Sequence, residues 1–305
     1  AVHLFSLTVV VIAYRRGVFK LSMSRLVRAL SISLVVFIGS LLLVKAYLNS
    51  AIDSNYAGDD QIVSMAWMDR PVPAKQYDGK YPEAESGIAQ TGRMKAIEKR
   101  GTLRVGYLSE SIPFAFRNEK GEVVGFDVEM AHNLATDMDV DLEVVKVTHD
   151  EISALFARGQ IDIVMSGLVA TPNRARIWGF SKSPMDLTLG LLVRDHQRKM
   201  FASVDLFKSK KGLQLGVVQG DPAFERWIQN ALPFAEIVQV SSPRKFLRGK
   251  LPDMDAVLYS AEGGSAWTLI YPDFSIVVPE NTEVRAPMIY PLPKGDAEWI
   301  GFVSA

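Results

Sequence analysis

The chain has 305 residues, of which 34 are basic and 34 acidic, so its formal net charge is zero. This balance argues against a nucleic-acid-binding protein, which normally has a basic excess on one domain. The sequence contains no cysteine, which excludes disulfides and thiolate metal sites, and its four histidines have no ligand-like spacing. We therefore predict no metal site, no cofactor and no nucleic-acid partner.

Two apolar stretches near the N-terminus predict membrane helices. Residues 1–14 are expected to be the end of a truncated transmembrane helix, and residues 29–48 to be a complete one, in which Lys45 can snorkel. The loop between them, residues 15–28, carries five basic residues and no acidic one, which places it in the cytoplasm and the rest of the chain outside. A buried core helix and a cleaved signal peptide are the alternatives for residues 29–48.

Residues 49–92 are polar and contain several prolines, and no helical or strand period persists in them, which is typical of a linker. From Ile97 onward, short β-rich runs alternate with helical patterns, as in an α/β fold with mostly parallel sheets. The predicted strands are 103–107, 142–147, 161–165, 189–193, 213–218, 237–240, 255–259 and 286–292, and the predicted helices are 127–138, 151–158, 222–232, 243–248 and 261–269.

These elements form two similar units. We predict one lobe from residues 93–190 plus 282–305 and a second from residues 191–281, with a return crossing near residues 276–278 and a hinge between the lobes.

The segment GFDVEMAHNLATDM, residues 125–138, resembles the signature of the family 3 bacterial extracellular solute-binding proteins. Further matches follow in the family's order: Leu103-Arg-Val-Gly106, Pro113-Phe114, Gly159-Gln-Ile-Asp162, Thr171-Pro-Asn-Arg174, Phe180-Ser181 and Val217-Val-Gln-Gly220. The resemblance covers about residues 100–295. It implies a two-lobed, periplasmic-binding-protein-like (type II) α/β fold that closes over a small polar solute, most often an amino acid.

The resemblance also implies a ligand wall in the first lobe. Arg174 occupies the position of the family's carboxylate-binding arginine, where a guanidinium pairs bidentately with a carboxylate; a solvated surface arginine is the alternative. Ser166 and Thr171 would offer backbone N–H groups and a hydroxyl. Gly167 and Val169 stand where serines often occur, so we expect fewer hydroxyl contacts and a roomier pocket.

Aromatic walls are expected from Phe114, Phe116 and His149, although Phe114 is equally compatible with the core and His149 with an exposed loop. In the second lobe, Gln219 lies between a strand and a helix, where backbone groups can bind an anion. Either Asp221 or Glu262, which lies two residues after Ser260, would supply the negative charge for an amino group. If neither does, the ligand is a carboxylate without an amino group, such as a dicarboxylate.

We therefore predict an extracytoplasmic receptor domain anchored in the bacterial inner membrane, with the binding domain in the periplasm or outside the cell. It would deliver an amino acid or related carboxylate to a transporter in the same or a partner polypeptide. The alternatives are a ligand-sensing domain of a membrane receptor and a dehydratase-like enzyme with Glu262 or His149 as acid–base residue. Because no nucleophile–base pair, phosphate loop or metal motif is present, we expect no catalytic residue and no enzyme.

Overall fold

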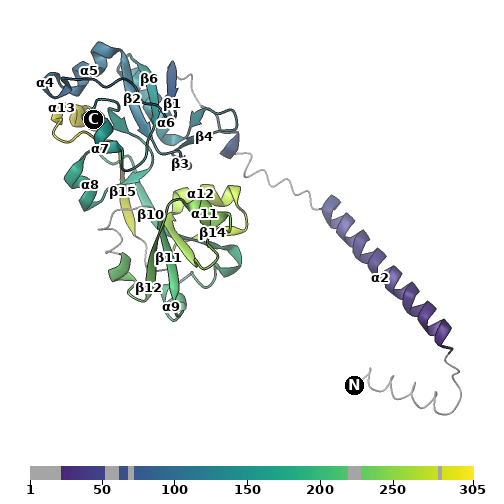
Figure 1. Ribbon diagram of the computed structural model, residues 1–305. Helices are drawn as coiled ribbons and strands as arrows, with labels where there is room; N and C mark the ends of the chain where they lie inside the picture. The colour runs from purple at the N-terminus through teal and green to yellow at the C-terminus, as the bar shows by residue number, and fades with distance from the viewer. Residues whose placement is uncertain (1–21, 52–61, 68–71, 219–227, 281–283) are drawn as a thin grey trace. The chain divides into compact units, whose positions relative to one another are not determined.

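The computed structural model describes residues 22–51, 62–67, 72–218, 228–280 and 284–305. The chain divides into two units, Ala1–Tyr56 and Ala57–Ala305. In the first unit, α2 (Met23–Ala51) contains the predicted helix at residues 29–48. Within the described residues, one stretch is long and apolar enough to cross a membrane: Val27–Lys45, 19 residues with a mean hydropathy of 2.3 and none of it buried (Figure 1). Residues 1–14 lie outside the described residues.

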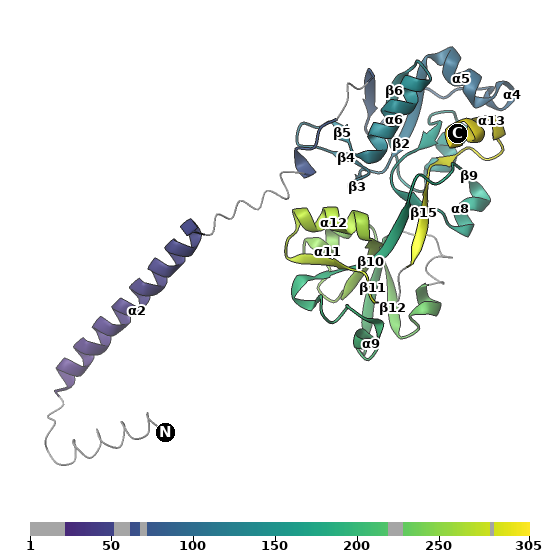
Figure 2. The same ribbon diagram turned by 180° about the vertical axis from the view of Figure 1, so that it is seen from behind.

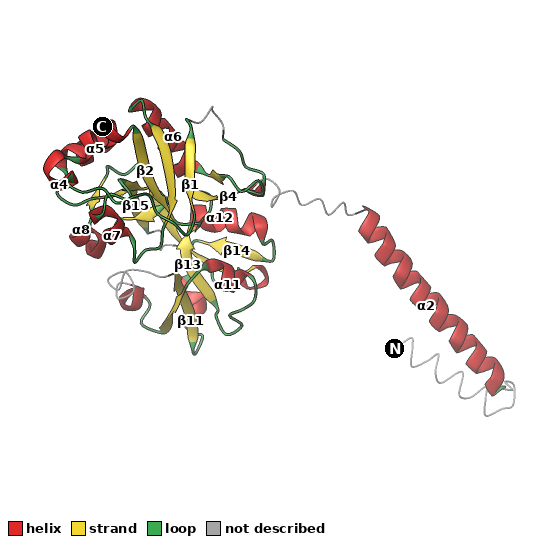
Figure 3. Cartoon of the chain, turned by 45° about the horizontal axis from the view of Figure 1, so that its top comes forward, coloured by secondary structure: helices red, strands yellow, loops and turns green. Residues whose placement is uncertain are grey.

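The second unit contains both lobes, and its strands are flanked by helices (Figure 3). The first lobe has a parallel sheet in the order β1-β6-β2-β7 and a small antiparallel sheet, β3-β4-β5. Its strands are β1 (Ala74–Tyr77), β2 (Thr102–Tyr107), β3 (Glu110–Ser111), β4 (Ala115–Arg117), β5 (Val123–Val124), β6 (Asp141–Lys146), β7 (Ile163–Val164), β9 (Gly179–Phe180) and β16 (Pro291–Leu292). Its helices are α4 (Ile88–Thr91), α5 (Arg93–Arg100), α6 (Phe126–Asp137), α7 (Ile152–Ala157), α8 (Pro172–Ile177) and α13 (Ala297–Ser304).

Part of the predicted linker is a structural element of the first lobe, which corrects that prediction. β1 pairs in parallel with β6 at the edge of the sheet, with Ala74 opposite Leu142. Ile62, further upstream, is 6% exposed and belongs to a hydrophobic cluster of the globular unit. The sequence did not predict β1, because three of its four residues are exposed and the strand lacks the alternation of apolar and polar residues that indicates a half-buried strand.

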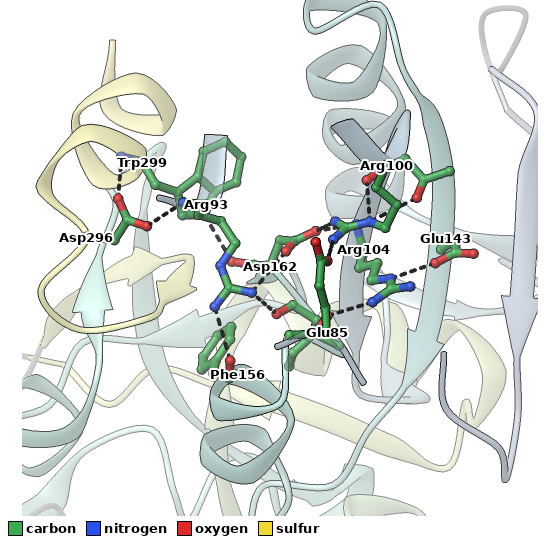
Figure 4. Close-up of polar contacts among 12 residues, drawn as sticks. Glu85, Arg93, Arg100, Arg104, Glu143, Phe156, Asp162, Asp296 and Trp299 are labelled. Carbon is green, nitrogen blue, oxygen red and sulfur yellow. Dashed lines mark hydrogen bonds and ion pairs between the residues drawn. The ribbon is translucent and has the colours of Figure 1, made fainter. Parts of the chain in front are cut away.

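A network of polar contacts around Asp162 joins α5, Glu85 of the predicted linker and helix α13 (Figure 4). Asp162 is fully buried and accepts hydrogen bonds from Arg93 Nη1 at 3.1 Å and from Arg100 Nη2. Trp299 of α13 donates from Nε1 to the Asp162 carbonyl at 3.0 Å, and Arg100 also pairs with Glu85. A buried carboxylate needs such partners to offset its desolvation. Both arginines lie in the predicted first lobe, and Glu85 is the residue of the predicted linker that joins this network.

The sheet of the second lobe extends into the first lobe, in the order β12-β11-β13-β10-β15-β8, with β14 also paired with β10. Its strands are β10 (Asp186–Arg194), β11 (Leu213–Val218), β12 (Ala235–Val240), β13 (Ala256–Ser260) and β14 (Phe274–Val277). The strand β15 (Arg285–Ile289) leads back to the first lobe, where it pairs with β8 (Leu168–Val169). Its helices are η1 (Asp195–Gln197), α9 (Val204–Phe207), α11 (Pro243–Leu247) and α12 (Ala261–Ile270).

The antiparallel strands β10 and β15 carry the chain between the lobes (Figures 1 and 2). The prediction that the chain returns to the first lobe near residues 276–278 is wrong. Those residues belong largely to β14, which pairs with β10 inside the second lobe, and the chain returns through β15 instead. The predicted helix at 222–232 lies mostly outside the described residues.

The two lobes also contact each other away from these strands. Glu110 Oε1 of β3 lies 3.1 Å from Arg244 Nε of α11, and the Ser242 hydroxyl donates to Glu110 Oε2. One hydrophobic cluster contains Phe116 and Val124 from the first lobe together with Trp267 from the second. The lobes therefore have a polar and an apolar contact in addition to their covalent connections.

Candidate functional site

A cavity of about 190 Å³ lies between the lobes. Many of its lining residues stand at the carboxyl ends of parallel strands, as expected for ligand sites in α/β folds. The lining consists of Leu108, Ser111, Phe114, His149, Ser166, Gly167, Leu168, Val169, Arg174, Leu187, Thr188, Leu189, Val217, Val218, Leu258, Tyr259, Ser260, Val284 and Ala286.

Arg174 lines the cavity from the first turn of α8. Thr171 is the N-cap of this helix and its hydroxyl accepts from the Arg174 N–H at 3.3 Å, while Pro172 occupies the first helical position, where a missing N–H costs nothing. Arg174 Nη1 donates to the Val169 carbonyl at 2.8 Å, which orients the guanidinium. Thr171 itself is 7% exposed and is not part of the lining, so it supports Arg174 rather than the cavity wall.

His149 also lines the cavity and is half-buried, which corrects the alternative of an exposed loop histidine. Burial, and secondarily the Arg174 cation, lower the pKa of His149 to about 4. At neutral pH its imidazole is therefore uncharged, and Arg174 is the ionised cation of the described lining.

Gly167 has a positive φ of 63°, and a Cβ atom there would lie 2.3 Å from Phe114 Cδ2. Its N–H donates to Asp127 Oδ2 at 2.6 Å. The prediction of a roomier pocket is therefore wrong at this position, because the Phe114 ring occupies the space that a side chain would take. The Gly167 N–H likewise has a protein acceptor.

Asp127 supports the cavity wall. The sequence analysis included it in the motif at residues 125–138 but gave it no role of its own. It is fully buried on α6, and its Oδ1 accepts from the Tyr290 hydroxyl at 2.8 Å. Burial raises the pKa of Asp127 to about 6, against the lowering effect of the Tyr290 and Gly167 hydrogen bonds. An acid at the first turn of a helix after a glycine turn was the available signal, but its two partners are distant in sequence.

The predicted aromatic wall is only partly present. Phe114 lines the cavity and also belongs to the core cluster of the first lobe. Phe116 is 3% exposed, lies in a hydrophobic cluster and is not part of the lining, which corrects its assignment. The Ser166 hydroxyl lines the cavity and accepts from the Leu108 N–H at 3.0 Å.

In the second lobe, Gln219 and Asp221 lie outside the described residues. Ser260 lines the cavity and is the N-cap of α12, with its hydroxyl accepting from the Gly263 N–H at 3.1 Å. Glu262 is not in the lining; its Oε1 and Oε2 lie 3.0 and 3.1 Å from the Thr188 N–H on β10, which donates to them. The described lining therefore contains no acidic side chain.

Tyr259 is a lining residue that the sequence analysis missed. It lies in β13 next to the last residue of the strand, Ser260. Burial raises the pKa of its hydroxyl to about 12, so it stays protonated. An aromatic residue at the carboxyl end of a predicted strand was a signal that could have identified this position.

A larger cavity of about 780 Å³ lies within the first lobe, between α4, α7 and the start of α13. Its charged lining includes Arg93, which is bound to Asp162, and Asp296, which caps α13 and accepts from the Arg93 N–H. These side chains have structural roles. The cavity between the lobes is the candidate site because it combines an ionised side chain with residues from both lobes.

Comparison with known proteins agrees with this geometry. The family model of the bacterial extracellular solute-binding proteins, family 3, matches residues 103–300. The L-cystine-binding protein TcyJ of Escherichia coli (strain K12) is 26% identical over 173 residues, which are 56% of this chain and 63% of that protein. The cyclohexadienyl dehydratase of Pseudomonas aeruginosa is 38% identical over 93 residues, 30% of this chain and 35% of that protein. The chain thus spans less than two thirds of the length of these curated relatives.

Solved structures show the same fold. The ancestral amino acid-binding protein AncCDT-1, a precursor of cyclohexadienyl dehydratase, has a TM-score of 0.60 and 28% identity, covering 69% of this chain and 90% of that chain. The arginine-bound form of truncated ArgBP from T. maritima has a TM-score of 0.59 at 24% identity, covering 69% of this chain and 96% of that chain. The predicted type II, two-lobed α/β fold is confirmed.

The expectation that the chain is not an enzyme, which rested on the absence of catalytic motifs, is contradicted by its relatives. They include a cyclohexadienyl dehydratase and a membrane-bound lytic murein transglycosylase F, beside several binding proteins. The fold and the family therefore do not by themselves separate binding from catalysis.

Proposed function

This chain belongs to the bacterial extracellular solute-binding proteins, family 3, and from that premise we propose that it captures an amino acid or related small carboxylate between its lobes. The observation that carries the proposal is Arg174, the ionised cation in the described lining of an otherwise apolar and neutral cavity. A carboxylate placed there would gain a charge-assisted hydrogen bond in a poorly solvated site. The relatives named for cystine, histidine and arginine binding support the amino-acid class.

Binding would be coupled to lobe closure. The cavity is lined by both lobes, and the strands β10 and β15 join them, so a ligand that contacts both walls favours the closed arrangement by its differential contacts. We propose Asp221 as the residue whose negative charge binds the amino group of the ligand. Glu262 is a weaker candidate, because its carboxylate oxygens accept from the Thr188 N–H.

The apolar helix α2 supports a second part of the proposal, a membrane anchor that holds the binding domain on the outer face of the bacterial inner membrane. A tethered receptor has a high local concentration at a transporter in the same or a partner polypeptide. Deleting residues 1–45, which contain both predicted membrane stretches, should release the chain from carbonate-washed membranes into the soluble fraction. Continued membrane association of this deletion variant would contradict anchoring by α2.

Ligand binding is tested with the full chain in detergent by isothermal titration against the common amino acids and C4 dicarboxylates. Arg174→Gln should weaken the tightest ligand by about 2–5 kcal/mol, because it removes one partner of a desolvated charge pair. The matched control is Arg176→Gln, an exposed arginine on the same helix, which should leave affinity unchanged. Equal affinities of the Arg174→Gln variant and the wild type would exclude Arg174 from the site.

A further inference from the structure

Three polar groups of the cavity lining are engaged with the protein itself. The hydroxyls of Ser166 and Ser260 and the N–H of Gly167 each hydrogen-bond to other protein groups. A polar ligand body placed against them would lose its water without gaining an equivalent partner, at a cost of about 1–3 kcal/mol for each unsatisfied group. The cavity therefore favours a ligand whose body, apart from the group facing Arg174, needs few hydrogen bonds.

The charges of the lining lead to the same conclusion. No acidic side chain belongs to the described lining, and Asp221 is proposed as the partner of the amino group, so a cationic ligand body has no counter-charge among the described lining residues. An acidic body would need a second ionised cation, whereas the other basic lining residue, His149, has its pKa lowered to about 4. Burying an unpaired charge is strongly unfavourable, so both kinds of charged body are disfavoured.

A second cavity, of about 360 Å³, lies in the second lobe. Its described lining contains no charged side chain and includes Leu191, Val204, Phe207 and Leu232. It shares Leu189, Leu258 and Val284 with the cavity between the lobes, so these three side chains form the boundary between the two spaces. The side of the site that faces the second lobe is thus apolar and continues into further apolar space.

Resting on the proposed function, we infer that the ligand is a monocarboxylate with an apolar body. Its carboxylate faces Arg174, and its body lies against Leu189, Leu258 and Val284, toward the apolar cavity of the second lobe. The chain would thus select aliphatic or aromatic amino acids, or the corresponding acids, over acidic and basic ones.

The test compares ligands that share one α-amino-carboxylate head and differ in the body. The full chain in detergent is titrated with L-norvaline, L-norleucine, L-lysine and L-glutamate; L-lysine has the norleucine chain with a terminal ammonium. We expect L-norleucine to bind about fourfold more tightly than L-norvaline, as one additional buried methylene predicts. L-Lysine and L-glutamate should bind at least tenfold more weakly than L-norleucine.

The outcomes separate the two proposals. Tightest binding of L-lysine or L-glutamate, lost in Arg174→Gln, would overturn the apolar-body inference and leave the carboxylate site intact. Binding of L-norleucine that is unchanged in Arg174→Gln, or no binding of any of these ligands and of the other carboxylates above, would overturn the proposed function and this inference with it.

A boundary variant tests the position of the body. Val284→Ala removes part of the boundary between the two cavities and should shift preference several-fold toward L-2-aminooctanoate relative to L-norleucine. Val278→Ala, an exposed valine outside both cavities, is the control and should leave this ratio unchanged. Identical ratios in wild type and Val284→Ala would contradict a body lying against Val284.

Discussion

The amide of Gly167 donates a hydrogen bond of 2.6 Å to the buried carboxylate of Asp127, forty positions earlier in the chain. This contact fixes the backbone that follows β7, which lines the cavity, to the signature helix α6. The same carboxylate accepts from Tyr290, which follows β15. Asp127 therefore connects the cavity wall to the segment through which the chain returns from the second lobe, and it acts on the site as a positioning residue.

Replacing Gly167 tests how closely its backbone packs against the Phe114 ring. Gly167→Ala should lower the free energy of unfolding by about 2–5 kcal/mol, because it adds a left-handed backbone strain and a methyl group against the Phe114 ring. Gly121→Ala is the matched control: its φ of 79° is also positive, but nothing lies within 4 Å of the added Cβ. Urea unfolding followed by tryptophan fluorescence gives the free energy of unfolding of each variant. Equal decreases for the two variants would show that the Phe114 ring moves aside without destabilising the fold.

Asp127 should make stability depend on pH. Its pKa in the folded chain is about 6, above the ordinary 3.8, so the folded state binds the proton more tightly than the unfolded state does. The contribution of this group to stability is therefore greatest below about pH 4 and is lost as the pH rises through 6, a change on the order of 3 kcal/mol. Asp127→Asn should remove that slope from urea unfolding curves measured between pH 4 and 7. Asp137→Asn, exposed on the same helix, should retain it.

His149 should contribute a slope of the opposite sign. Its folded pKa of about 4 lies below the ordinary 6.5, so its contribution to stability is fully present above pH 6.5 and is lost as the pH falls toward 4. Because the slopes of Asp127 and His149 partly cancel, the measurement is the difference between wild type and His149→Gln at each pH. This difference should change between pH 6.5 and 4, whereas His196→Gln, outside the cavity lining, should show no such change. A flat difference for His149→Gln would argue that the imidazole is fully solvated.

Glu110 should help to keep the lobes together. Glu110 Oε1 and Arg244 Nε lie 3.1 Å apart, and both side chains are partly exposed. We therefore expect this ion pair to stabilise the contact between the lobes by about 0.2–1 kcal/mol. Glu110→Gln should therefore speed ligand dissociation by about 1.5- to 5-fold in stopped-flow measurements, with a smaller effect at high salt because the pair is screened. Glu98→Gln, on an exposed position of α5, is the control. An unchanged dissociation rate for Glu110→Gln would show that this contact does not contribute to closure.

Local patterns in the sequence were sufficient for several of the strands and helices of the fold. β11 (Leu213–Val218) and α6 (Phe126–Asp137) lie within one or two residues of their predicted bounds, because apolar periodicity and a glycine turn are properties of neighbouring residues. The charge-free stretch within α2 is visible for the same reason. The order of motifs from Leu103 onward was enough to predict the family and its two-lobed fold.

The membership of the cavity wall, by contrast, was decided by tertiary structure. Phe114 and Phe116 are two residues apart with similar sequence contexts, yet one lines the cavity and the other is confined to a hydrophobic cluster. The sequence made Glu262 a candidate to bind the amino group of the ligand. In the structure its carboxylate instead accepts a hydrogen bond from the Thr188 N–H, seventy-four positions away. Side-chain direction and partner choice depend on contacts between distant segments, and a sequence read in short windows contains the residues of a site but not the distances between them.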